Sequence, residues 1–271
     1  MRGSLREKSS LWTCGTAAAK GAEPHTPHIK FMKSLIAICL AVGTAISQDA
    51  PKFSPPKEVA PGVFEVGAVR LDKNTRTVTL PAKVNMSDGL VEYLCVTPRG
   101  ATHESVLVSE AGPQNVHVAM LLLGAKGAAV GDPKQAPGQI TAEFLAKLPK
   151  LTGDRVMLSV KWKDKDGREQ TVPVERWVQQ RTPQKNQPGN EAPMSDGPWI
   201  YNGSFVYEGR FVAEGEGVYA AIATMPSALI NNPRPGATDD KMWFANTAAM
   251  PPVGTPVEFI IKLEQPKEEP K

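Results

Sequence analysis

The chain has 271 residues, of which 41% are hydrophobic and 22% charged, which fits one or two globular domains with an ordinary core. The formal net charge of +3 comes from residues 1–47, because the remaining residues comprise 25 basic and 26 acidic side chains. The basic balance is therefore no argument for binding nucleic acid or an anionic membrane, and no nucleic-acid partner is expected.

The N-terminal region has the order of signals found in a secretory leader. Met32-Lys33 supplies a positive charge, Leu35–Ile46 is an apolar run, and the small residues Ala45 and Ser47 fit the A-x-A-like cleavage rule. This order predicts a signal peptide over 32–47, cleaved after Ser47, and a periplasmic or secreted protein. The apolar run is too short to cross a bilayer, so no transmembrane span is expected.

Composition predicts how the chain is divided. In order, we expect an over-extended or disordered leader at 1–31, the signal peptide, a proline-rich tether at 48–61, a β-rich domain at 62–265 and a disordered tail at 266–271. Two similar strand–proline–helix patterns, beginning at Ser105 and Gly217, suggest that the domain consists of two similar halves, 62–180 and 199–265.

Short runs of β-branched, aromatic or alternating residues between turn signals predict strands. These runs are 62–69, 75–80, 81–84, 91–97, 105–109, 155–163, 169–174, 199–207, 209–213, 217–224 and 257–263. Val91–Ser109 is interpreted as a hairpin with its turn at Pro98–Gly100, and Arg155–Val174 as a second hairpin. The polar, proline-containing segment Arg181–Pro198 is predicted to be a long loop.

One helix is clear, at about 113–123. Pro113 suits a first helical turn, Val116, Ala119, Met120 and Leu123 recur at helical spacing, and glycines follow. Shorter helices are predicted at Thr141–Leu148 and Pro226–Ile230. The expected fold is therefore α+β and β-rich, with mostly antiparallel strands and hairpins, one clear helix and one or two short ones.

Cysteine content limits the cofactors. Cys95 is the one cysteine left once the predicted leader is removed, so no intramolecular disulfide can form. An iron–sulfur cluster usually requires four thiolate ligands and is excluded. No cofactor is expected, although a divalent metal remains an alternative.

The candidate functional cluster is His103, Glu104, Ser105 and His117. His103 and His117 with a carboxylate would suit zinc or a similar metal, but strand alternation turns His103 and Glu104 to opposite faces, and no recognised ligand spacing is present. The alternative is that these side chains hydrogen-bond the turn and flank the helix. A nucleophilic Ser105 or Cys95 activated by His103 is disfavoured, because Ser105 lacks a G-x-S-x-G elbow and Cys95 lies in an apolar strand.

A second polar cluster lies near the C-terminal end of the domain and comprises Asn231, Asn232, Arg234, Asp239 and Asp240. Its oxygens could bind calcium, but the EF-hand spacing is missing, so Asx turns and an Arg–Asp pair are favoured. A third group is aromatic and could form either a binding face or part of the core: Trp199, Tyr201, Tyr207, Tyr219 and Trp243.

The chain resembles the YdjY-domain family of exported bacterial proteins. The resemblance is carried by Glu92-Tyr93, Val96-Thr97-Pro98, Thr102–Ser105, the His117–Gly124 helix, Trp199–Ser204, Asn231–Arg234, Asp239-Asp240 and Gly254–Val257, and covers roughly residues 60–265. It implies an envelope or secreted location and no established activity. The ferredoxin-like label that some members carry conflicts with the single remaining cysteine.

These observations favour a non-catalytic exported module that binds an unknown envelope protein or ligand, or has a structural role. The alternative is a metal-binding protein or metal-dependent envelope enzyme that uses His103, Glu104 and His117.

Overall fold

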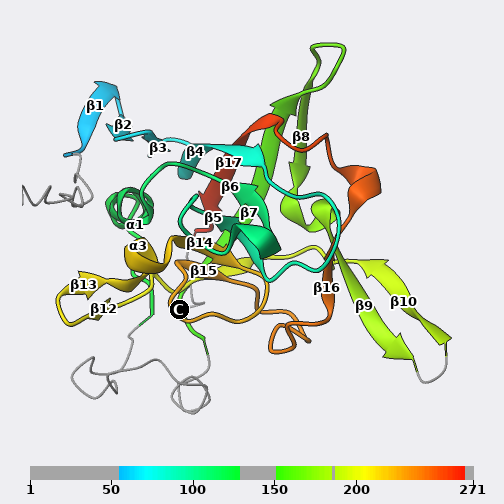
Figure 1. Ribbon diagram of the computed structural model, residues 1–271. Coiled ribbons are helices and arrows are strands. Elements are labelled where there is room, and N and C mark those ends of the chain that lie inside the picture. Colours follow the sequence, from blue (N-terminus) through cyan, green and yellow to red (C-terminus); the bar gives the residue numbers. More distant parts are fainter. Residues whose placement is uncertain (1–54, 129–150, 185–186, 266–271) are drawn as a thin grey trace, which may run out of the picture. The chain divides into compact units, whose positions relative to one another are not determined.

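The computed structural model describes residues 55–128, 151–184 and 187–265 (Figure 1). The predicted leader at 1–31, the signal peptide at 32–47, the first half of the tether (48–54), the predicted helix at 141–148 and the tail at 266–271 lie outside the described residues. The second half of the predicted tether is part of the sheet, because Lys57–Ala60 forms a strand that pairs with Val63–Val66.

Eight strands form a closed barrel, because β6 pairs back with β4 through Lys83↔Val108 and Val84↔Leu107. Around the ring the strands are β4 (Thr77–Val84), β17 (Pro256–Leu263), β7 (Asp154–Lys163), β11 (Trp199–Tyr201), β15 (Ile230–Asn231), β14 (Val218–Ala221), β5 (Tyr93–Val96) and β6 (Ser105–Val108). Neighbours in the ring are antiparallel except β14–β15 and β5–β6, which are parallel.

The other elements extend or flank the barrel (Figure 1). Strands β1 (Lys57–Ala60), β2 (Val63–Val66) and β3 (Val69–Asp72) continue the sheet beyond β4, and β8 (Glu169–Pro173) pairs with β7. A separate sheet has the order β10 (Gln187–Pro193), β9 (Val178–Gln184), β16 (Trp243–Ala245), and a small hairpin joins β12 (Val206–Tyr207) to β13 (Arg210–Phe211). The helices are α1 (Pro113–Leu122), α3 (Val212–Glu216) and the 3₁₀ turns η1 (Thr102–Glu104), η3 (Val174–Trp177) and η4 (Thr247–Ala249).

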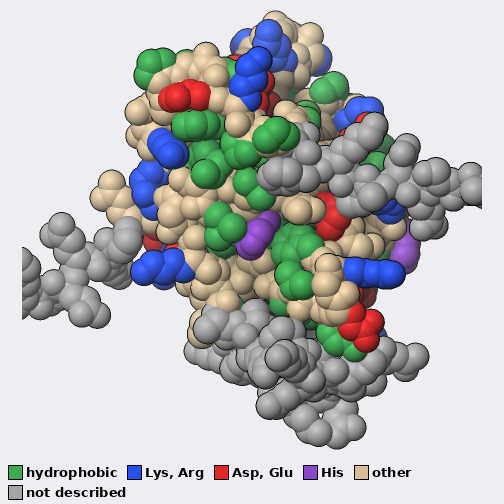
Figure 2. Space-filling view, turned by 90° about the vertical axis from the view of Figure 1, so that its left-hand side faces the viewer, with side chains coloured by type: hydrophobic (Ala, Val, Ile, Leu, Met, Phe, Trp, Pro, Cys, Tyr) green, Lys and Arg blue, Asp and Glu red, His purple; other side chains and the backbone are tan. Residues whose placement is uncertain are grey.

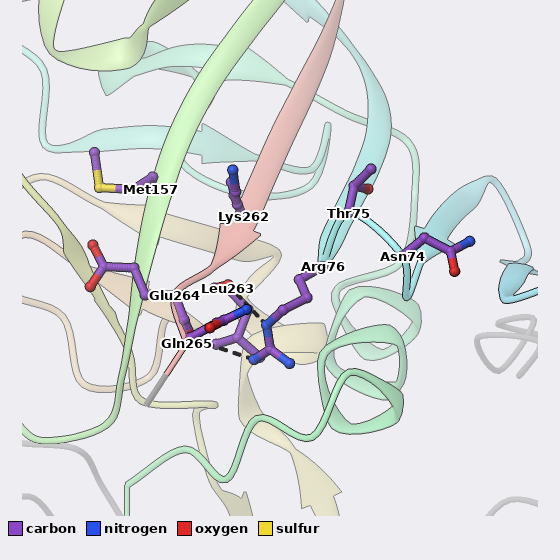
Figure 3. Close-up of a pocket in the computed structure, with 8 residues that line it drawn as sticks. All are labelled: Asn74, Thr75, Arg76, Met157, Lys262, Leu263, Glu264 and Gln265. Atoms are coloured by element: carbon purple, nitrogen blue, oxygen red, sulfur yellow. Dashed lines mark hydrogen bonds between the residues drawn. The ribbon is translucent and has the colours of Figure 1, made fainter. Parts of the chain in front are cut away.

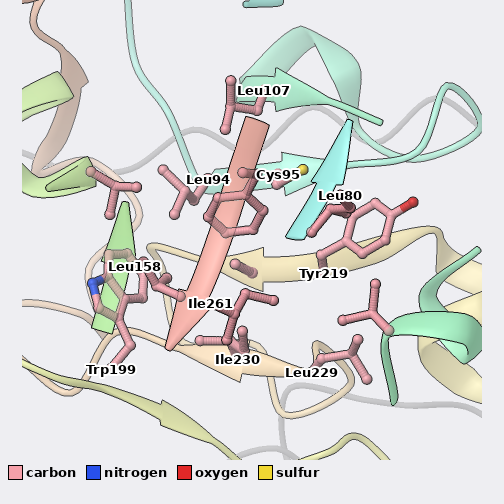
Figure 4. Close-up of a cluster of buried hydrophobic side chains, with 14 of the residues drawn as sticks. Leu80, Leu94, Cys95, Leu107, Leu158, Trp199, Tyr219, Leu229, Ile230 and Ile261 are labelled. Atoms are coloured by element: carbon pink, nitrogen blue, oxygen red, sulfur yellow. The ribbon is translucent and has the colours of Figure 1, made fainter. Parts of the chain in front are cut away.

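Side chains fill the barrel interior (Figure 4). Burial alternates along β4 and β17, as expected for strands with one face in a core. The buried side chains of the barrel strands belong to one apolar cluster, which extends over both faces of the barrel wall and includes Leu80, Leu94, Cys95, Leu107, Leu158, Trp199, Tyr219, Ile230, Phe259 and Ile261. An eight-stranded barrel is just wide enough for such filling, so a ligand is expected to bind at the outer surface or at the ends.

The β-rich class and the helix at 113–123 are confirmed, but several sequence interpretations are wrong. The predicted strand 209–213 is the short strand Arg210–Phe211 followed by the start of α3. Val91–Ser109 is not a hairpin, because β5 and β6 run parallel with Tyr93 opposite Ser105. The predicted loop Arg181–Pro198 contains most of the β9–β10 hairpin. Pro226–Ile230 forms a turn that leads into β15 rather than a helix. In each case the local composition was compatible with several conformations, and pairing with distant strands decided among them.

The two proposed halves do not form separate units. Residues 62–180 supply β4, β5, β6 and β7, whereas residues 199–265 supply β11, β14, β15 and β17. In the ring, β17 lies between β4 and β7, so the two segments interleave. They build one barrel with a shared core.

Candidate functional site

Helix α1 lies across the end of the barrel at which β6 finishes. Its buried residues Val116, Ala119 and Met120 join the core cluster, and the helix also contacts β2, β3, β4 and α3. Gly112 provides no side-chain cap, but the Glu214 carboxylate of α3 accepts a hydrogen bond from the Gln114 amide at 3.0 Å. An acid at this position satisfies a free helix N–H and suits the positive end of the helix dipole.

His117 projects from α1 to the last residue of β11. Its Nδ1 is 2.7 Å from the Tyr201 hydroxyl, and its ring lies 4.8 Å from the Phe211 ring, centroid to centroid. Tyr201 is fully buried, whereas His117 is only partly so. One side of the imidazole therefore lies at the protein surface, and the buried Tyr201 hydroxyl fixes its orientation from the core side.

Burial sets the protonation of this pair. It lowers the pKa of His117 below the ordinary 6.5 and, with a smaller contribution from Asp154, raises the pKa of Tyr201. Near neutral pH the tyrosine is therefore protonated and the histidine uncharged. Tyr201 is the imidazole's one hydrogen-bond partner among the described residues. The tautomer that satisfies both groups has the hydroxyl donating to Nδ1 and a proton on Nε2.

The backbone around the pair is tightly packed. Asp154 Oδ2 accepts hydrogen bonds from the amides of Lys126 and Gly127 at 2.6 and 2.8 Å, which holds the segment after α1 against β7. A side chain at Gly203 would come within 3.4 Å of the imidazole. His117 is thus packed against backbone segments that are themselves fixed by hydrogen bonds and close contacts.

The surface beside His117 is apolar. Of the five exposed large hydrophobic residues in the described part of the chain, Leu121 (48% exposed) and Leu122 (36%) lie on α1, and Val206 (50%) pairs with Phe211. Leu121 follows His117 by one helical turn. Figure 2 shows hydrophobic side chains gathered around a histidine on one face of the molecule. We call the surface formed by His117, Leu121, Val206 and Phe211 the α1 patch.

His103 does not lie near the α1 patch. It belongs to η1, which precedes β6, whereas α1 follows β6, so the two histidines are at opposite ends of a strand about 13 Å long. In addition, β6 and Tyr201's strand β11 are four steps apart in the eight-strand ring, on opposite walls. The His103 Nε2 atom is instead 3.7 Å from Glu104 Oε1, at the exposed surface. The structure does not bring His103 and His117 together.

The possible nucleophiles are also separate from His103. Ser105 is fully buried and its hydroxyl donates to the Leu107 carbonyl at 2.8 Å. Cys95 is buried in the barrel, and burial raises the pKa of its thiol. Neither side chain is placed to attack a substrate with His103 as its base. Within the described ranges, no three His, Cys, Asp or Glu side chains form a group that could hold a metal ion.

The second polar cluster is a buried hydrogen-bond network around Arg234. The guanidinium binds Glu175 Oε1 at 2.6 Å, the Gly197 carbonyl at 2.7 Å and Asn232 Oδ1 at 3.2 Å. Glu175 also accepts from the Trp199 indole at 2.9 Å. The partner of Arg234 is thus Glu175 of η3, and the expected pairing with an aspartate is wrong.

The other members of this cluster have separate roles. Asn231 binds both main-chain groups of Met225 and the Asn202 amide oxygen, whereas Asp239 accepts from the Lys241 amide in the predicted Asx-turn manner. Asp240 is exposed. The pKa of Glu92 is raised chiefly by burial and then by the negative charges of Glu104 and Asp240. Four of the five singled-out aromatic residues are core, namely Trp199, Tyr201, Tyr219 and Trp243.

Three partners were not predicted from the sequence: Tyr201 for His117, Glu175 for Arg234, and Glu214 for the N-terminus of α1. Each lies at least 59 positions from the residue it serves. One local signal was available for Glu175, since a single acid between Val174 and Trp177 in an apolar run is expected to need a buried partner.

The fold and the site define a class: a filled, closed β-barrel with a helix across one end and a tyrosine-bound histidine at its apolar surface. The model of the YdjY domain matches residues 69–262, from β3 to β17, and the chain belongs to the YdjY-domain family. No curated protein and no solved structure matches the chain. In the part of the chain that the structure describes, no helix has the length and apolar character needed to cross a membrane.

Proposed function

We propose that this protein is an exported, non-catalytic binding module, and that it binds an apolar segment of a partner protein on the α1 patch. The observation that carries the proposal is the imidazole of His117, which is fixed by Tyr201, packs on Phe211 of the β12–β13 hairpin and lies one helical turn before exposed Leu121. Contiguous exposed apolar side chains with a few oriented polar groups are typical of interaction sites.

The chemistry of the patch suits a peptide segment. Apolar side chains of the partner would cover Leu121 and Val206. The Nε2 proton of His117 would donate to a main-chain carbonyl of the partner, since a buried donor needs an acceptor. The bond to Tyr201 fixes the direction of this donor and so reduces the entropy lost on binding.

Several features support a non-catalytic role. The partner of His117 Nδ1 is a protonated tyrosine, not the carboxylate that typically orients a catalytic histidine. The serine and cysteine considered as nucleophiles are buried in the core. The metal-dependent alternative with His103, Glu104 and His117 stays a prediction, and the placement of the two histidines does not favour it.

The proposal is tested by binding the full-length chain to an array of random 12-residue peptides, followed by affinity measurement for the best apolar peptide. We expect Leu121→Asp to weaken that affinity at least about 10-fold, because a charge would be buried in the interface. Replacing His117 with Phe, which keeps an aromatic ring but removes the donor, should weaken it by a smaller factor.

Val253→Asp is the matched control, since Val253 is a similarly exposed valine (58%) in the loop before β17. It should leave peptide affinity unchanged. An array without enriched apolar peptides, or equal binding by the Leu121→Asp and Val253→Asp variants, would rule out the α1 patch as the binding surface.

A further inference from the structure

A second surface feature is a cavity of about 710 Å³ on the outside of the barrel (Figure 3). It lies between the turn that joins β3 to β4, strand β7 and the end of β17. The residues that line it are Asn74, Thr75, Arg76, Met157, Lys262, Leu263, Glu264 and Gln265. It shares no lining residue with the α1 patch.

The cavity has an excess of positive charge. Within the described residues, neither Arg76 nor Lys262 forms an ion pair with a carboxylate. The one carboxylate in the lining, Glu264, is held by Arg155, whose Nε is 2.7 Å from its Oε2. Arg76 and Lys262, two cations without carboxylate partners, therefore line the same cavity, and Figure 3 shows their side chains pointing in opposite directions at the end of β17.

Arg76 is held firmly in place. Its backbone has a φ of +56°, in the left-handed region that non-glycine residues rarely adopt. Its carbonyl accepts from the Leu263 amide at 2.9 Å, and its guanidinium donates to the carbonyls of Leu263 and Glu264, both at 3.3 Å. Figure 3 shows these two side-chain bonds. They use carbonyl acceptors, so the guanidinium keeps its full charge and has further N–H donors available.

We propose that this cavity binds an anionic group, a phosphate or a carboxylate, carried by a larger ligand. Arg76 and Lys262 supply the charge and the hydrogen-bond donors, and guanidinium geometry suits either anion. Met157 provides an apolar wall, and the cavity is larger than a single phosphate. The Asp72 carboxylate, whose Oδ1 accepts hydrogen bonds from the Asn74 and Thr75 amides, offsets part of this positive charge.

The test is a titration of the ¹⁵N-labelled full-length chain with pyrophosphate and, separately, with citrate, followed by NMR. We expect saturable amide shifts at Thr75, Arg76 and Lys262, with dissociation constants on the order of 1 mM for these exposed groups. Lys262→Gln should weaken binding at least about 3-fold.

Lys161→Gln is the matched control. It removes the same charge from another barrel strand, but Lys161 is already paired with Glu169 and Glu258 at 3.5 and 3.1 Å. It should leave binding unchanged. Saturation by pyrophosphate alone would assign a phosphate ligand, and saturation by citrate alone a carboxylate. Shifts that do not saturate, or that weaken equally in both variants, would overturn the proposal.

Discussion

At the scale of single residues, the ion pair between Arg234 and Glu175 is buried, with side chains 7% and 1% exposed. Replacing Arg234 with Leu would leave the Glu175 carboxylate in the core without its partner. We expect this to lower the free energy of unfolding by about 3–5 kcal/mol, as is usual when one member of a buried pair is removed. Urea unfolding followed by tryptophan fluorescence measures the loss.

Two further variants test whether the loss of stability comes from the buried position of this ion pair. Arg176→Leu breaks the exposed pair with Asp196 and should cost at most about 1 kcal/mol. The double variant in which Arg234 and Glu175 are both Leu should be more stable than Arg234→Leu alone, since no buried charge is then unpaired. Equal losses for Arg234→Leu and Arg176→Leu would contradict the structural role assigned to this pair.

His117 is expected to make stability depend on pH. Because burial lowers its folded-state pKa below 6.5, the unfolded chain binds a proton there before the folded protein does. Stability should therefore fall as pH drops below about 6.5 and through the folded-state value. Between pH 7.5 and pH 5.5, the free energy of unfolding should fall more for the wild-type chain than for the His117→Phe variant. His103→Asn removes an exposed imidazole instead and serves as the control. If the free energy of unfolding falls equally in His117→Phe and in the wild-type chain, His117 is not the source of the pH dependence.

Sequence alone identified His117 and Arg234 as residues to examine but not what they do. Their roles depend on Tyr201 and Glu175, which lie 84 and 59 positions away. No local pattern encodes such contacts, because they arise only when β11 and η3 take their places around the barrel. The spacing of apolar residues along one helix or strand carries no information about partners on another.

At the scale of elements, the α1 helix was predictable and the direction of β6 was not. Pro113 and the apolar spacing up to Leu123 are local signals, and helix formation follows them. The hairpin predicted at Val91–Ser109 is wrong, and the Thr97 amide at the end of β5 instead donates to the carbonyl of Gly217, the residue that ends α3 and precedes β14. Gly100 packs against the same glycine, which directs the chain away from β5 and back toward the start of β6.

The N-terminus of α1 gives a prediction at this scale. Glu214 is its acceptor for the Gln114 amide, so Glu214→Ala should lower the free energy of unfolding by about 1–2 kcal/mol through loss of a helix cap. Glu214 is also paired with Arg99, 66% exposed, at 3.4 Å. Arg99→Gln removes that pair but keeps the cap and should cost at most about 1 kcal/mol. Thermal or urea unfolding of both variants decides which interaction matters.

At the scale of the whole molecule, ring closure joins segments that are far apart in the sequence. β17, near the C-terminus, lies between β4 and β7, and β4 closes onto β6. Neither 62–180 nor 199–265 therefore contains a complete barrel wall. A sequence can show that each run is a strand, but the order around a ring depends on which non-local pairs bury the most apolar surface.

This interleaving predicts that the barrel unfolds as one cooperative unit. Trp177, Trp199 and Trp243 are buried in one core cluster but lie in segments on both sides of residue 190, so their fluorescence reports on both. Urea transitions followed by fluorescence and by far-UV circular dichroism should coincide. Removing residues 199–265 should abolish the fluorescence shift and the cooperative transition. Two separated transitions, or a cooperative transition in the 62–180 fragment, would instead mean that the first half folds independently of the strands that complete its barrel.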